Sequence, residues 1–218
     1  NGNDAFTRYA QYGGDANAFT SFVRTAYLFS CTNNFSENLE VLLDFVTHPY
    51  FSEQTVKKEQ GIIGEEIRMY EDNPNWRVFF NMLGAMYVNH PVRRDIAGTI
   101  ESISQITPEI LYKCYNSFYN LHNMALCVCG DVTPEQVEAV CDKVLKPAPE
   151  ISISRMAVDE PEHIHQERVT LNLEVAQPLF CIGIKQTPAK TPEERLKKNA
   201  VNDILLQLLF GKSSDFYN

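Results

Sequence analysis

The stretch KEQGIIGEEIRMYEDNPNW, Lys58 to Trp76, predicts a helix with an unusual face. Gly61 and Gly64 lie inside it, although a glycine within a helix costs up to about 1 kcal/mol relative to alanine. Glu59 and Glu66 are seven residues apart. At roughly 100° per residue, two positions with this spacing are separated by about 20° around the helix axis. The two carboxylates therefore share one face of a helix that also lacks two side chains.

Two interpretations of this face are open. Charged helix residues are usually exposed, so the ordinary interpretation is a face in contact with solvent. Ile62 and Ile63, together with the two glycines, favour the alternative that another element packs tightly there and the carboxylates point into the contact. A buried carboxylate needs a cation, a metal ion or a set of hydrogen-bond donors. Zinc bound by one carboxylate and two histidines is a catalytic arrangement of this kind.

Composition narrows the class of protein. The 218 residues are 44% hydrophobic and carry 28 acidic against 19 basic side chains, a net charge of −9. An acidic chain without a basic cluster argues against nucleic acid or an anionic membrane as partner. No apolar run approaches the ~18 residues of a membrane span, and the first residues contain no apolar segment typical of a signal peptide. Six scattered cysteines without a CxxC pair indicate reduced thiols, so a cytoplasmic protein is expected.

Capping signals and apolar periodicity predict an alternation of helices and strands. Ser52, Thr107, Thr133 and Thr191 mark helix starts, the last three followed by proline. Further helices are expected over 4–12, from Ser36 to 48 and over 74–88, and strands over 16–22, 25–32, 123–131, 169–175 and 178–186. In the strand 123–131, predicted to be buried, Cys127 and Cys129 would share a face as small core residues.

The chain divides into three parts by composition. Between 146 and 168 it is rich in Pro, Glu, Ser and His, which is typical of an interdomain linker. We therefore expect a first domain over 1–147, a linker over 148–168 and the start of a second domain over 169–218. The last part, strand, strand and helix, is too small to fold alone.

Five stretches together resemble one family, the pitrilysin/insulinase zinc peptidases, or inverzincins, which include mitochondrial processing peptidase. They are GGDANAFTSFVRTAYLF (13–29), PYFSEQTVKKEQGIIGEEI (49–67), NHPVRRDIAGTIESISQIT (89–107), YNLHNMALCVCGDV (119–132) and QPLFCIGIK (177–185). The likeness is greatest to the bacterial branch of paired, processing-type members. It implies an α+β fold of two related domains, each with an antiparallel-rich sheet and helices on one face.

The resemblance also implies roles for individual residues. Glu66 matches the family's third zinc ligand, and Glu59 matches a glutamate beside the ligands that orients them or shares protons. The glycines would let this helix lie against the helix that carries the motif H-x-x-E-H, whose histidines bind zinc and whose glutamate is the general base. The strand residues Asn17, Ala18, Phe19 and Thr20 match the edge strand to which an extended peptide substrate adds. From the residues alone, an ordinary core strand is equally consistent.

The sequence departs from the family at one point, because H-x-x-E-H is absent. None of the five histidines has the required spacing: they are His48, His90, His122, His163 and His165. In the family the motif precedes the ligand glutamate by several tens of residues, so it would fall just before Asn1. Either the chain is truncated or the parent protein lost the motif, and the presence of both glutamates favours truncation. One zinc ion is expected in the intact parent, whereas the 218-residue chain alone is expected to bind none and to be inactive.

The sequence thus predicts part of a zinc metalloendopeptidase that hydrolyses peptides or short polypeptides. The alternative is a non-catalytic, peptidase-like subunit that binds peptide or supports an active partner. A paired homologous subunit or a homo-oligomer is expected as protein partner. His163 and His165 could place two imidazoles on one strand face as a metal site, although a polar linker is the favoured interpretation of this segment.

Overall fold

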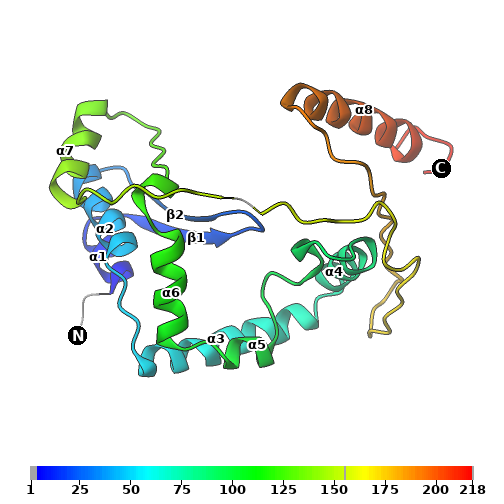
Figure 1. Cartoon of the computed structure of the whole chain (residues 1–218), viewed down its shortest axis with the longest axis horizontal. Helices are drawn as coiled ribbons and strands as arrows, with labels where there is room; N and C mark the ends of the chain where they lie inside the picture. Colours follow the sequence, from blue (N-terminus) through cyan, green and yellow to red (C-terminus); the bar gives the residue numbers. More distant parts are fainter. Residues whose placement is uncertain (1–3, 155, 218) are drawn as a thin grey trace.

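The computed structural model describes residues 4–154 and 156–217. It is an α+β structure in which helices predominate and one antiparallel hairpin forms the described sheet. Figure 1 shows most helices grouped around this hairpin, while the last helix lies apart at the other end of the molecule. The predicted α+β class is confirmed.

The N-terminal part is built around the hairpin and one buried helix. Helix α1 (Ala5–Gln11) leads into strands β1 (Asp15–Thr20) and β2 (Thr25–Ser30), followed by α2 (Phe35–Thr47). The strands pair in antiparallel register from Asp15 opposite Ser30 to Thr20 opposite Thr25. Helix α2 packs on α7 (Pro134–Val144), and Leu39, Leu43 and Val140 form the buried centre between them. Both predicted strands of the hairpin are confirmed.

Four further helices follow α2 before α7. They are α3 (Glu53–Glu71), α4 (Pro74–Met86), α5 (Ile100–Ser104) and α6 (Pro108–Phe118), with short 3₁₀ turns η1 (Pro91–Arg93) and η2 (Leu121–Asn123). The predicted caps Ser52, Thr107 and Thr133 are confirmed, since each hydroxyl accepts the amide three residues ahead. The predicted cap Ser36 is wrong: the N-cap of α2 is Asn34, two residues earlier, which adopts a left-handed φ of 55°.

Three predicted strands are absent from the described structure. Apart from Asn123, the last residue of η2, residues 123–131, 169–175 and 178–186 run as irregular chain, and Cys127 and Cys129 are exposed rather than buried. A strand is stable only where a neighbour completes its hydrogen-bond ladder, and β1 and β2 pair only with each other among the described residues. The local pattern of these segments is therefore insufficient to make them strands here.

The part after α7 has a single described helix, α8 (Pro192–Phe210), and Thr191 caps it as predicted. The predicted linker 148–168 contains neither helix nor strand where it is described, and the division into domains at 147 and 169 stays a prediction. Gly183 lies close to α4, because a side chain at this position would collide with Met82 and Met86 of that helix. None of the described helices combines the length and apolar character needed to span a membrane.

Candidate functional site

The orientation of α3 is set by its inner face. Val56, Gly64 and Ile67 are buried there. Gln60 Nε2 donates to the carbonyl oxygens of Ile103 (3.0 Å) and Ile106 (2.9 Å), which lie in and just after α5. These contacts attach one side of α3 to α5, and the rest of its circumference faces outward.

Glu59 and Glu66 lie on that outward side. Both are exposed, and three apolar side chains beside them are exposed as well: Ile62 by 52%, Ile63 by 37% and Met69 by 60%. No described element covers this face, so the contact predicted from the glycines is not made within the described residues. A side chain at Gly61 would meet open space, whereas one at Gly64 would touch Ile103 on the inner face at an ordinary 3.9 Å. The two glycines therefore do not form one contact surface.

Glu66 is held by a side chain that sequence reasoning missed. The Tyr70 hydroxyl, one helical turn on, donates to Glu66 Oε1 at 2.6 Å. This hydrogen bond is the main cause that raises the pKa of Tyr70 above its ordinary value. The spacing of four residues between acid and phenol on a helix was the available signal. Glu65, by contrast, pairs with Arg68.

Aromatic rings connect Tyr70 to the turn of the hairpin. Tyr70 stacks on Trp76 with ring centroids 4.2 Å apart and planes 10° apart. Trp76 contacts Phe80 at 4.9 Å, and Phe80 contacts Phe22, between β1 and β2, at 6.2 Å. Trp76 Nε1 also donates to Asp95 Oδ2 at 2.7 Å. The hairpin turn and the Glu66 face are thus joined through α4.

The strand predicted to bind substrate is β1 of the hairpin, whereas the two glutamates lie on α3. Asn17, Phe19 and Thr20 are exposed, and Asn17 Oδ1 accepts the Ala18 amide at 2.8 Å. β1 pairs with β2 along one edge, and no described strand occupies its other edge. An unpaired edge of this kind can accept an extended peptide as a further strand.

The described residues supply part of a metal site at most. No three His, Cys, Asp or Glu side chains among them come close enough to hold one ion, and this includes His163 and His165. Glu66 offers one exposed carboxylate, with Oε1 bound by Tyr70, which suits a single ligand of zinc. Two further protein ligands would have to come from outside the described residues.

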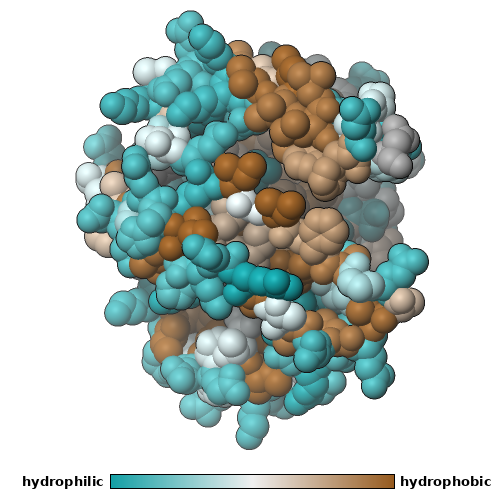
Figure 2. Space-filling view, turned by 90° about the vertical axis from the view of Figure 1, so that its right-hand side faces the viewer, coloured by the Kyte–Doolittle hydropathy of each residue, from teal (hydrophilic) through white to brown (hydrophobic). Residues whose placement is uncertain are grey.

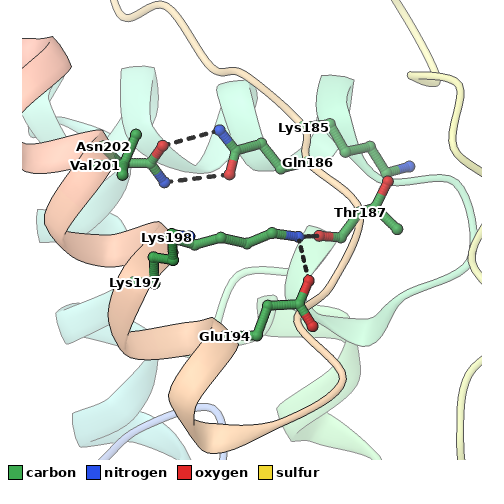
Figure 3. Close-up of a pocket in the computed structure, with 8 residues that line it drawn as sticks. All are labelled: Lys185, Gln186, Thr187, Glu194, Lys197, Lys198, Val201 and Asn202. Atoms are coloured by element: carbon green, nitrogen blue, oxygen red, sulfur yellow. Dashed lines mark hydrogen bonds and ion pairs between the residues drawn. The ribbon is translucent and has the colours of Figure 1, made fainter.

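A hollow lies elsewhere, between α8 and the chain before it (Figure 3). It has a volume of about 590 Å³. The side-chain amides of Gln186 and Asn202 bind each other at 3.0 and 3.2 Å, and Lys198 Nζ binds the Thr187 carbonyl oxygen (2.9 Å) and Glu194 (3.3 Å). These four side chains thus attach residues 186–187 to α8.

Two family models match consecutive parts of the chain. The model "Insulinase (Peptidase family M16)" matches residues 1–100, and the model "Peptidase M16 inactive domain" matches residues 105–218. Among curated proteins, the uncharacterized zinc protease YmfH of Bacillus subtilis is 48% identical over 98% of this chain and 51% of its own length. The uncharacterized zinc protease YmxG of the same organism is 30% identical over 81% of this chain and 43% of its own length.

Solved structures agree with these matches. An M16-like peptidase from Alicyclobacillus acidocaldarius superposes with a TM-score of 0.82 at 34% identity, over 98% of this chain and 51% of its own. A protease from Helicobacter pylori superposes with a TM-score of 0.66 at 25% identity, over 72% of this chain and 40% of its own. The chain thus spans about half the length of the curated relatives it matches. With both family models matched in order along its sequence, the chain belongs to the insulinase family of peptidases, M16.

Proposed function

We propose that this chain is part of a zinc-dependent metalloendopeptidase that hydrolyses peptides or short polypeptides. The observation that carries the proposal is Glu66 itself. It lies on an outward face of α3, exposed and held by Tyr70, in the stretch that resembles the family's ligand helix. The relatives described as zinc proteases support the same assignment.

In this proposal each part of the chain has a distinct task. Glu66 supplies one carboxylate ligand, and Glu59, on the same face, orients ligands or shares protons. Bound zinc lowers the pKa of a coordinated water and polarises a peptide carbonyl. The open edge of β1, from Asn17 to Thr20, binds the substrate backbone as an added strand and leaves its side chains to set specificity. The remaining ligands and the general base would come from outside this chain.

A second function is favoured by one observation. The family model matched by residues 105–218 is described as that of an inactive domain. A non-catalytic subunit that binds peptide, or supports an active homologous partner, would need only the open β1 edge. The presence or absence of H-x-x-E-H in the intact protein distinguishes the two functions, because only the peptidase requires this motif.

The test is metal-dependent cleavage by the intact protein. We expect about one zinc ion per chain by elemental analysis and hydrolysis of a quenched fluorescent peptide library that stops with a chelator and returns with zinc. The 218-residue chain serves as control and is expected not to cleave, because one carboxylate cannot fix zinc. Intact protein without bound zinc, or with cleavage insensitive to chelator, would overturn the proposal.

A further inference from the structure

We propose that Tyr70 is a positioning residue for Glu66: its hydroxyl holds one carboxylate oxygen and leaves the other directed to the metal ion. The inference rests on the proposed function, because it concerns the ligand role of Glu66. Tyr70 belongs to neither the glutamate pair of α3 nor the family motif. The proposal also covers the side chains that hold Tyr70 in place.

The hydrogen bond divides the carboxylate into two unequal oxygens. Tyr70 donates to Oε1 at 2.6 Å, which is short for an O–H···O bond and typical of an ionised acceptor. No described residue donates to Oε2. A carboxylate bound in this way can offer Oε2 to a metal ion as a single-oxygen ligand while its orientation is maintained by the phenol.

Tyr70 is itself held on its ring face. The stacking on Trp76, at 4.2 Å and 10°, restricts rotation of the phenol ring. Trp76 is held in turn by its hydrogen bond to Asp95 Oδ2, and Asp95 Oδ1 accepts the Ala97 amide at 2.9 Å. This chain of contacts, from Asp95 through Trp76 and Tyr70 to Glu66, will be called the tyrosine bracket.

The physical need for the tyrosine bracket follows from the exposure of Glu66. A free glutamate on a helix surface samples several rotamers, and fixing it on metal binding costs conformational entropy. The tyrosine bracket restricts Glu66 to one rotamer before the metal ion binds. Partners that orient a ligating side chain typically change metal affinity or activity by ~10–100-fold when removed.

The test measures zinc affinity of the intact protein by competition with a chromophoric chelator. Tyr70→Phe keeps the ring and its stacking and removes only the hydroxyl. We expect its zinc affinity to fall by ~10-fold or more. The absorption spectrum of the Co²⁺-substituted protein should also change, because the ligand is no longer held in one orientation. Tyr50→Phe is the matched control, since Tyr50 is 79% exposed and lies just before α3. Thermal midpoints of the metal-free variants report whether folding is preserved.

The outcomes separate this inference from the proposed function. If Glu66→Gln loses zinc while Tyr70→Phe binds it as tightly as the unchanged protein, with the same Co²⁺ spectrum, the positioning role is refuted and the ligand assignment stands. If Glu66→Gln keeps zinc, or the intact protein binds none, both fail. Loss of affinity in Tyr70→Phe and not in Tyr50→Phe, with equal thermal midpoints, establishes the positioning role.

Discussion

Two adjacent glutamates of α3 have different surroundings, although they differ by only one position in sequence. Glu66 accepts the Tyr70 hydroxyl on the outward face, whereas Glu65 pairs with Arg68 about 100° around the helix. Both are exposed, so exposure alone does not distinguish a ligand from a surface charge. Their hydrogen-bond partners differ, and only Glu66 shares a helix face with a second carboxylate, that of Glu59.

This difference predicts three results in the intact protein. The Glu66→Gln variant should bind zinc weakly or not at all, because a neutral amide oxygen is a poorer ligand than a carboxylate. Glu59→Gln should keep most of its zinc and lower the rate of peptide cleavage by ~10–100-fold. Glu65→Gln should change neither. Zinc per chain and cleavage rate check all three.

The opposite order of effects would show that the helix register is wrong. A Glu65→Gln variant that lost zinc, beside a Glu66→Gln variant that kept it, would move the site to the other face of α3. Glu65→Gln removes the ion pair with Arg68, but this loss should hardly change the stability of the protein, because exposed ion pairs contribute about 0–1 kcal/mol.

At the scale of elements, one carboxylate joins three separate segments. Glu160 accepts the backbone amides of Val88 (2.9 Å), Asn89 (2.7 Å) and His90 (2.6 Å), just after α4. It also pairs with Lys185 Nζ at 2.6 Å, and both side chains are largely buried, with 13% and 9% exposed. The predicted linker is therefore attached to the end of α4 and to the chain that precedes α8.

This cluster predicts a pH dependence of stability. Burial by itself would raise the pKa of Glu160, but Lys185 and the three amides outweigh it and lower the pKa to about 2, from an ordinary 4.5. A depressed pKa means that the ionised form stabilises the folded state above pH 4.5, and that this contribution disappears as the pH falls toward 2. We expect Glu160→Gln to lower the free energy of unfolding at pH 7, and the difference from the unchanged chain to shrink in acid.

Urea unfolding between pH 7 and the lowest pH at which the chain stays folded measures this difference. Glu162→Gln is the matched control, because Glu162 is exposed in the same segment and should have no such effect. A Glu160→Gln variant whose deficit stayed constant with pH would mean that the ionised carboxylate does not stabilise the folded chain.

At the scale of the whole molecule, much apolar surface is exposed. Helix α8 has no buried residue, and its exposed side chains include Leu196 (72%), Ile204 (61%) and Leu208 (71%). Figure 2 views the side on which α8 lies in Figure 1, and hydrophobic side chains gather at several places on it. Apolar patches of this kind, together with the open edge of β1, favour association.

We therefore expect the 218-residue chain to self-associate in solution. Sedimentation velocity over a broad concentration range should show species larger than a monomer. The double variant Ile204→Glu/Leu208→Glu should reduce them, while Asn199→Glu, which adds charge to the same helix without removing an exposed apolar side chain, should not. A monodisperse monomer at all concentrations would contradict this expectation.

The sequence by itself determined the local elements of this protein. Ser52, Thr107, Thr133 and Thr191 begin their helices as predicted, because a cap and its amide lie within one turn of chain. The hairpin was predictable for the same reason, since its two strands are neighbours in sequence. The shared face of Glu59 and Glu66 also followed from helical spacing alone.

Only the tertiary structure decided which of these patterns found partners distant in sequence. The strand patterns at 123–131, 169–175 and 178–186 did not form strands, because no described neighbour completes their ladders. Trp76 contacts Asp95, 19 residues away, and Glu160 contacts Val88, 72 residues away. No local pattern of the sequence encodes these contacts. Hydrogen bonds within one turn depend on a few consecutive residues, whereas these contacts depend on how the whole chain packs.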